Sequence, residues 1–143
     1  MITRAIHTAY KTARERKWTR IYWAVDIHGT MMPHTHRGTD LPKTFYAHAR
    51  EVLQIASSRN EICLILYTCS HKSEIENYLD FFKTNGIHFD YVNENPEAEN
   101  TEYGDYKHKP YFNVLFEDKA GFDPENDWEQ VFVLLNDADT LKL

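Results

Sequence analysis

The residues best suited to chemistry are carboxylates and a hydroxyl that follow apolar runs lying far apart in the sequence. In chain order they are Asp26 after residues 21–25, Thr68 after residues 62–67, and Glu117 with Asp118 after residues 112–116. Carboxylate oxygens are the ligands that hard divalent cations prefer, and an ionised carboxylate is also a nucleophile. Chemistry at these residues requires that the ends of the three runs lie side by side.

The stretch from Tyr22 to Thr30 organises the first of these segments. An apolar run leads to Asp26, and a short turn through Gly29 then ends in the hydroxyl of Thr30. Glycine lets the backbone turn sharply, so that amide N–H groups can approach a bound anion. The alternative interpretation is a strand followed by an Asp/Gly turn with no function, because such turns are common.

Apolar runs alternate with amphipathic segments along the chain, a pattern typical of an α/β fold with a parallel sheet. The strands expected are 21–25, 62–67, 88–92 and 112–116, and the helices expected are 2–16, 43–57, one from the cap Ser70 to Asn85-Gly86, and one that opens at Asp123-Pro124. Right-handed crossovers place the carboxyl ends of parallel strands on one edge of the sheet. We therefore expect Asp26, Thr68 and Asp118 to converge at that edge, where such sheets bind ligands.

The length of 143 residues predicts a single domain, residues 1–143, with residues 1–18 as an N-terminal helical extension and residues 31–42 as a flap loop. An apolar content of 42% and an aromatic content of 14% indicate a globular fold. The net charge of −6 argues against broad nucleic-acid binding. No apolar stretch is long enough for a signal peptide or a membrane span, so a cytoplasmic protein is expected.

Charge is distributed unevenly along the chain. Basic side chains crowd residues 4–20, whereas acidic side chains crowd residues 94–105. Solvated faces explain both segments, and a basic helix that binds a partner is the alternative interpretation of the first. The two cysteines, Cys63 and Cys69, are expected to be packing thiols of a reducing compartment.

Taken together and in order, four segments resemble the motifs of the haloacid dehalogenase-like (HAD) phosphatase superfamily. They are Asp26-Ile27-His28-Gly29-Thr30, Thr68 after an apolar strand, Lys109-Pro110, and Glu117-Asp118 after another strand. The resemblance covers about residues 20–120. It implies a three-layer Rossmann-like sandwich with a mainly parallel sheet and the minimal cap of the small members.

The resemblance also implies a Mg²⁺-dependent phosphatase or phosphotransferase that acts on a small phosphorylated substrate through an aspartyl-phosphate intermediate. The nucleophile would be Asp26, and Thr68 and Lys109 would bind the phosphate. Backbone N–H groups near Gly29 and the helix opening at Ser70 would add anion-binding donors. The implied Mg²⁺ ligands are Asp26, the backbone carbonyl of His28, Asp118 and, directly or through a water, Glu117.

His28 departs from the family pattern, which usually has a second Asp there as general acid and base. Histidine exchanges protons near neutral pH, so we expect His28 to take over that role. The alternative function is a catalytically impaired HAD-like protein that binds an anion, a nucleotide or a protein partner. Dehalogenase-type chemistry at Asp26 is a weaker option, because a displacement at carbon needs no metal-binding acid such as Asp118.

Simpler interpretations compete for several of these residues. Thr68 would then be a strand-end cap, Lys109 a solvated side chain, and Glu117-Asp118 a plain turn. The pair His34 and His36 could bind zinc, but no Cys or nearby carboxylate cluster completes a coordination shell. We expect these two histidines to face the substrate or solvent on the flap.

Overall fold

The computed structural model describes residues 1–34, 44–137 and 141–143. The sheet has four strands in the order β3-β2-β1-β4, all parallel. The strands are β1 (Ile21–Val25), β2 (Ile62–Leu66), β3 (Tyr91–Val92) and β4 (Val114–Phe116). The helices are α1 (Ile2–Arg16), α2 (Ala49–Ser58), α3 (Lys72–Thr84) and α4 (Asp127–Asn136), with a short 3₁₀ turn η1 (Asp118–Ala120) after β4.

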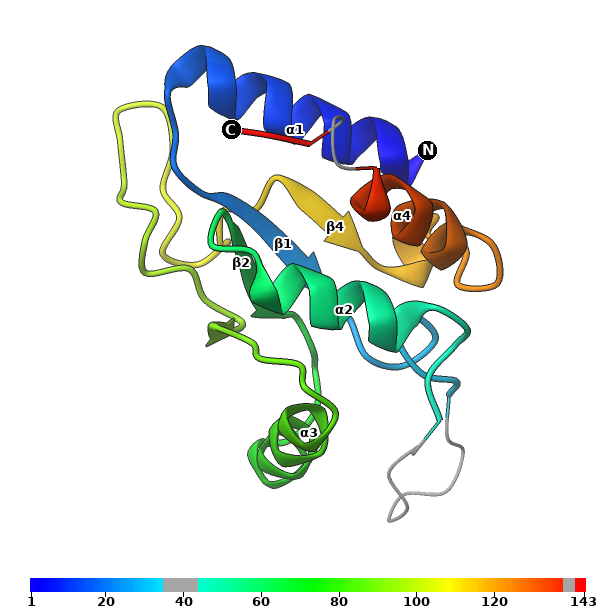
Figure 1. Cartoon of the computed structure of the whole chain (residues 1–143). Helices are drawn as coiled ribbons and strands as arrows, with labels where there is room; N and C mark the ends of the chain where they lie inside the picture. Colours follow the sequence, from blue (N-terminus) through cyan, green and yellow to red (C-terminus); the bar gives the residue numbers. More distant parts are fainter. Residues whose placement is uncertain (35–43, 138–140) are drawn as a thin grey trace.

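Helices flank this sheet (Figure 1), so the predicted α/β fold is confirmed. The arrangement is consistent with a Rossmann-like three-layer sandwich. Strand β1 lies between β2 and β4, and its last residue, Val25, is in register with Leu66 on β2 and with Phe116 on β4. These three strands therefore end level with one another, and the residues that follow them lie at one edge of the sheet.

One face of the sheet packs against helices through large aromatic side chains. Trp23 on β1 contacts Phe116 on β4 with 5.1 Å between ring centroids, and Phe116 stacks on Trp128 of α4 at 5.4 Å. All three rings are fully buried. Helix α4 also contacts α1 and α2, so these helices form a common layer over the sheet. Burial of this apolar area is the main force that holds the sheet and the helices together.

The opposite face of the sheet is covered by the connection between β3 and β4, residues 93–113. Tyr22 and Cys63 are neighbours on this face, and Tyr22 packs against Tyr111 with 6.1 Å between ring centroids. Tyr67 packs against Phe112 at 5.8 Å. The connection contains no helix or strand, as predicted for residues 93–109. An irregular segment thus covers a face of the sheet that a helix usually covers in such folds.

Several element boundaries differ from those expected. Helix α2 begins at Ala49 rather than near residue 43, because His48 adopts a left-handed conformation with φ 68°. Helix α3 follows His71, and the hydroxyl of Ser70 does not cap it. Pro124 lies in a turn before α4 instead of at its first position. The expected flap, residues 31–42, falls outside the described residues from position 35 onward, and His36 with it.

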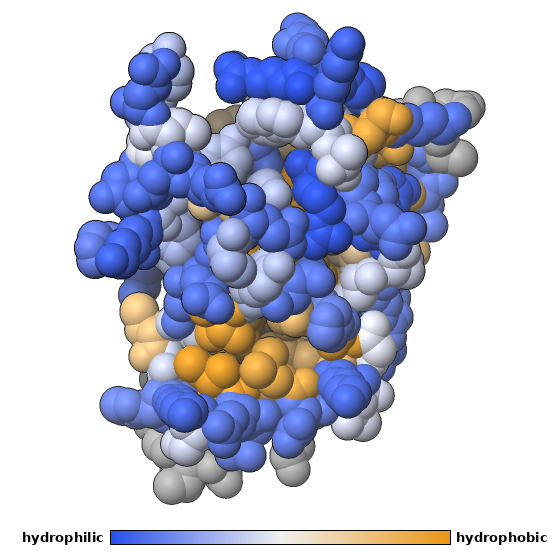
Figure 2. Space-filling model, turned by 90° about the vertical axis from the view of Figure 1, so that its left-hand side faces the viewer, coloured by the Kyte–Doolittle hydropathy of each residue, from blue (hydrophilic) through white to orange (hydrophobic). Residues whose placement is uncertain are grey.

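The surface at the amino ends of the strands is mostly hydrophilic, and its hydrophobic residues gather mainly in the lower half of the view (Figure 2). No described helix has both the length and the apolar character that crossing a bilayer requires.

Candidate functional site

Three carboxylates meet at the carboxyl edge of the sheet. Asp26 directly follows β1, and its backbone N–H donates to the carbonyl of Phe116 at 3.0 Å, which continues the pairing of β1 with β4. Glu117 and Asp118 directly follow β4. One carboxylate oxygen from each of Asp26, Glu117 and Asp118 lies within 4.8 Å of the other two. We call these three residues the acidic site.

A buried hydroxyl links two of these acids. Thr30 Oγ1 accepts a hydrogen bond from the backbone N–H of Asp118 at 3.1 Å and donates one to Asp26 Oδ2 at 3.5 Å. The carbonyl of Thr30 accepts from the indole N–H of Trp128 at 2.8 Å, and Thr30 itself is fully buried. The core therefore fixes Thr30, and Thr30 in turn fixes how the ends of β1 and β4 lie relative to each other.

The turn between Asp26 and Thr30 requires glycine. Gly29 has φ +76°, a conformation that side chains with a Cβ rarely adopt. A Cβ at this position would also lie 2.7 Å from Asp118 Oδ2 and would collide with His34 Nε2. The absence of a side chain thus lets Asp118 and His34 approach the backbone of the turn.

The three acids perturb one another electrostatically. Burial, followed by the charge of Asp118, raises the pKa of Asp26. Burial and the neighbouring Asp118 also raise the pKa of Glu117. Burial alone would raise the pKa of Asp118, but the neighbouring side chains of Glu117 and His34 lower it. Acids that gain from holding a proton also gain from holding a cation, which removes the same repulsion.

The donor set of the acidic site fits a hard divalent cation. Asp118 Oδ1 is buried and has no hydrogen-bond partner among the described residues. A buried carboxylate oxygen without a partner is costly, and a bound ion would satisfy it. Carboxylate oxygens without sulfur or imidazole ligands are the set that Mg²⁺ or a similar ion selects.

His28 contacts Tyr78 on α3. Its Nε2 lies 2.6 Å from the hydroxyl of Tyr78, and its ring stacks on that of His34 with 6.5 Å between centroids. Burial, followed by the charge of His34, lowers the pKa of His28. His34 Nε2 in turn lies 3.6 Å from Asp118 Oδ2. Two imidazoles thus stand beside the acidic site, and His28 favours its neutral form.

Thr68 and Ser70 lie at the same edge, because β2 ends level with β1. The Thr68 hydroxyl lies 2.9 Å from Ser70 Oγ and accepts from the Ser70 backbone N–H at 3.2 Å. The side chain of Asn93 accepts a hydrogen bond from the backbone N–H of Thr68 and donates one to the backbone carbonyl of Thr68, each at 2.8 Å. The two hydroxyls face each other, and neither contacts a carboxylate of the acidic site in the described structure.

Lys109 lies in the connection 93–113, which leads to the amino end of β4. Two residues further on, Tyr111 packs edge-on against Trp18 with 6.3 Å between ring centroids, and Trp18 precedes β1. Asp26, by contrast, follows the end of β1. Lys109 is exposed, and within the described part of the chain it forms no ion pair. The structure therefore brings the predicted acids together but does not bring Lys109 to them.

Sequence reasoning gave no role to three residues that shape the site: Thr30, His34 as a partner of Asp118, and Tyr78. Thr30 could have been found from its position four residues after Asp26 across a glycine turn. Tyr78 lies on the apolar stripe of α3 and is buried, so nothing in the sequence separates it from its core neighbours.

Comparisons with known proteins inform the fold but not the chemistry. No protein-family model matches the chain, and no curated protein matches it. Among solved structures, the chain is similar to a conserved protein coded by a locus of Bacteroides thetaiotaomicron, with a TM-score of 0.61 and 20% identity. The match covers 81% of this chain and 89% of that chain. At this level of identity, the similarity concerns the fold alone.

Proposed function

We propose that this protein is a Mg²⁺-dependent phosphoric monoester hydrolase or phosphotransferase that acts on a small phosphorylated molecule. The observation that carries the proposal is the acidic site, in which Asp26, Glu117 and Asp118 come from two neighbouring strand ends and approach within 4.8 Å. Asp118 Oδ1, buried and without a partner in the described structure, supports a cation there. A bound Mg²⁺ would offset the negative charge of the acids and of the phosphate.

In this proposal Asp26 attacks phosphorus. A bond forms between a carboxylate oxygen of Asp26 and phosphorus, the ester bond to the leaving alcohol breaks, and an aspartyl-phosphate remains. Hydrolysis by water then releases inorganic phosphate and restores Asp26. Thr30 keeps Asp26 in place, and the backbone of the Gly29 turn and the hydroxyls of Thr68 and Ser70 offer donors to the phosphate oxygens.

His28 is assigned the proton transfers. In its neutral form its ring has one nitrogen that can accept a proton and one that can donate, and Tyr78 holds Nε2. General acid–base help of this kind is worth about 10²–10⁴ in rate. We expect His28→Ala to lower turnover within that range, with little change in Mg²⁺ binding.

Two observations favour the alternative, a catalytically impaired relative that binds an anion, a nucleotide or a protein partner. Lys109, the cation expected at the phosphate, forms no ion pair within the described part of the chain. Thr68 already bonds Ser70 at 2.9 Å. Under this alternative, the acidic site binds a cation but turns over no substrate.

The test is release of phosphate from an aryl phosphate, measured with and without Mg²⁺. We expect the native chain to release phosphate only with Mg²⁺, and Asp26→Asn to release none, because an amide is not a nucleophile. Asp80→Asn is the matched control, since Asp80 is an exposed acid on α3. No release over a broad panel of phosphate esters, with Mg²⁺ binding retained, would instead establish the alternative.

A further inference from the structure

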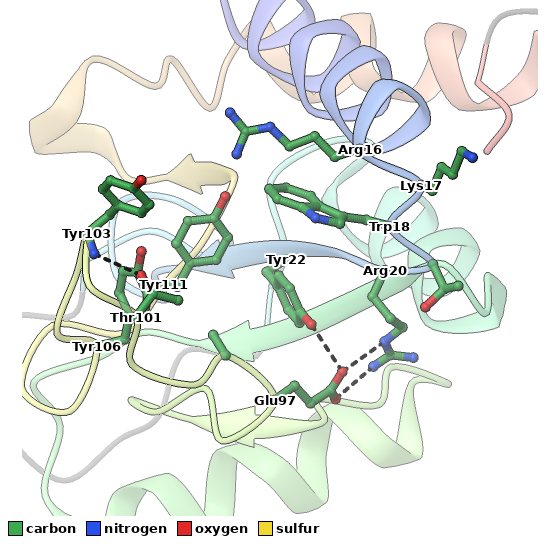
Figure 3. A pocket seen from close by; sticks show the side chains of 12 residues that line it. Arg16, Lys17, Trp18, Arg20, Tyr22, Glu97, Thr101, Tyr103, Tyr106 and Tyr111 are labelled. Carbon is green, nitrogen blue, oxygen red and sulfur yellow. Dashed lines mark hydrogen bonds and ion pairs between the residues drawn. The ribbon is translucent and has the colours of Figure 1, made fainter.

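A cavity lies at the edge of the sheet opposite the acidic site. It has a volume of about 660 Å³ and is formed between the end of α1, the start of β1 and the connection that precedes β4 (Figure 3). Its lining includes Arg16, Trp18, Tyr22, Tyr103, Tyr106 and Tyr111. We call it the aromatic pocket. Its volume falls in the range of sites that hold small molecules.

Five of the twelve residues that line this pocket are aromatic, and Tyr111 packs against three of the others. Tyr111 meets Trp18 edge-on at 6.3 Å, Tyr22 at 6.1 Å and Tyr106 at 5.3 Å between ring centroids. Tyr103 is 90% exposed, and in the view of Figure 3 it lies on the other side of Tyr111 from Trp18. Exposed aromatic faces of this kind are platforms on which a planar ring can stack.

The pocket also carries a cation without an anionic partner. The guanidinium of Arg16 lies 5.4 Å from the centre of the Trp18 ring, and within the described part of the chain it forms neither an ion pair nor a hydrogen bond. Arg20, in contrast, is already paired, because its Nε lies 3.2 Å from Glu97 Oε1. Figure 3 shows Arg16 extending over the rings, so its donors are available to a ligand that lies on them.

The size of the anion is limited by the charges around the pocket. The whole chain has a net charge of −6 and acidic residues crowd the connection 93–113, whereas Lys17 is a second basic side chain that lines the pocket. A polyanion such as single-stranded nucleic acid would be repelled beyond the pocket, whereas one anionic group beside Arg16 would not. The surroundings thus favour a small ligand with a single anionic group.

We propose that the aromatic pocket binds a small molecule with a planar aromatic ring system and one anionic group, of the class of the nucleoside monophosphates. The ring system stacks against Trp18 and Tyr103, and the anionic group accepts hydrogen bonds from Arg16. The pocket is at the opposite edge of the sheet from Asp26, so it does not depend on the function proposed for the acidic site.

The test is titration of the full chain with adenosine 5′-monophosphate in buffer containing a chelator and no divalent cation, followed by calorimetry. The chelator keeps the acidic site free of metal, so binding there does not contribute. Adenosine and inorganic phosphate are titrated separately. We expect the monophosphate to bind about tenfold more tightly than adenosine, as the loss of a charge-assisted hydrogen bond implies, and phosphate alone to bind much more weakly.

Two exposed positions allow substitution without disturbing the core. Arg16→Gln should weaken binding of the monophosphate about tenfold and leave the affinity for adenosine unchanged. Tyr103→Ala should weaken both ligands by about tenfold, because it removes a stacking face. Arg4→Gln is the matched control, since Arg4 is an exposed arginine on α1 that does not line the pocket.

Three outcomes would overturn the proposal. One is the absence of saturable binding up to about 1 mM, the weak end of small-molecule affinity. Another is equal weakening by Arg16→Gln and by Arg4→Gln, which would indicate attraction by the overall field of α1. The third is loss of binding in Asp26→Asn with Arg16→Gln and Tyr103→Ala unaffected, which would place the ligand at the acidic site.

Discussion

At the scale of single residues, the acidic site is held by groups that do no chemistry themselves. Thr30 bonds Asp26 with its hydroxyl and accepts from the backbone of Asp118, while Gly29 leaves room for Asp118 and His34. Burial and the closeness of the acids raise the pKa values of Asp26 and Glu117. At Asp26 and Glu117 the folded protein without metal therefore binds protons more tightly than the unfolded chain, so the contribution of these two residues to stability falls as pH rises through their raised pKa values.

A cation should reverse this loss of stability. We expect Mg²⁺ to raise the Tm of the native chain at pH 7, by the equivalent of about 2.7 kcal/mol when Mg²⁺ is at a hundred times its Kd. Asp26→Asn should raise the Tm measured in a chelator, because it removes one of the repelling charges, and should reduce the effect of Mg²⁺. Asp80→Asn serves as the control. An unchanged Tm of the native chain with saturating Mg²⁺ at constant ionic strength would rule out the metal site.

Gly29→Ala should damage the site more than the fold. The left-handed conformation of residue 29 costs about 1–2 kcal/mol with a Cβ present, and the Cβ would push Asp118 and His34 aside. We expect a lower free energy of unfolding by about that amount in urea and a loss of the Mg²⁺-dependent rise in Tm. Gly121→Ala is an informative comparison, because Gly121 also has a positive φ, 102°, but a Cβ there meets nothing within 4 Å. Equal loss of Mg²⁺ binding in both variants would show that backbone strain alone, without the contacts, is responsible.

At the scale of secondary-structure elements, α4 supports the site from behind. Its Trp128 stacks on Phe116 of β4 and donates its indole N–H to the carbonyl of Thr30 at 2.8 Å. Helix α4, which follows Asp118 in the sequence, thus holds the turn that ends at Thr30. The packing of α4 on the sheet and the geometry of the acids are therefore coupled.

Trp128→Phe tests this coupling. Phenylalanine keeps an aromatic ring against Phe116 but leaves the buried carbonyl of Thr30 without its donor, at an expected cost of about 1–3 kcal/mol in the free energy of unfolding. We also expect weaker Mg²⁺ binding, since Thr30 orients Asp26 and Asp118. Denaturation in urea and a Mg²⁺ titration measure the two effects. Val133→Ala on the exposed side of α4 is the control, and a variant Trp128→Phe with native Mg²⁺ affinity would show that Thr30 does not need this support.

At the scale of the whole molecule, one sheet separates two chemically different regions. The carboxyl edge carries the acids, whereas the amino edge carries the aromatic pocket with Arg16. Both are joined by β1, which begins beside Trp18 and ends before Asp26. The connection 93–113 covers one face of this sheet and brings Glu97 to Tyr22 and Arg20.

The two cysteines report on the integrity of this architecture. Burial is the main cause that raises the pKa of Cys63 to about 12, and Cys63 is fully buried on β2, whereas Cys69 is exposed. At pH 8 only about one Cys63 side chain in ten thousand is a thiolate. We therefore expect iodoacetamide to modify Cys69 alone in the native protein. Both should react in denaturant, as read by mass spectrometry. Equally rapid modification of both thiols without denaturant would contradict the burial of Cys63 on β2.

The amino-acid sequence by itself determined the α/β class, helix α1 and strand β1 with their bounds, and the positions of Asp26, Glu117 and Asp118 at strand ends. Those features follow from hydrophobic periodicity and from the rule that parallel strands end on one edge, and both operate locally along the chain. The convergence of the three acids was therefore predictable.

Only the tertiary structure decided the course of the segment that contains Lys109. It also decided the hydrogen-bond partners of Thr30, His28 and Ser70. The pocket of aromatic rings at the opposite edge likewise appears only in the tertiary structure. Lys109 and the rings of Tyr103, Tyr106 and Tyr111 belong to a connection without helix or strand. Such a segment has no periodicity that fixes its path, and its course is set by contacts with residues far away in the sequence, such as Trp18 and Tyr22.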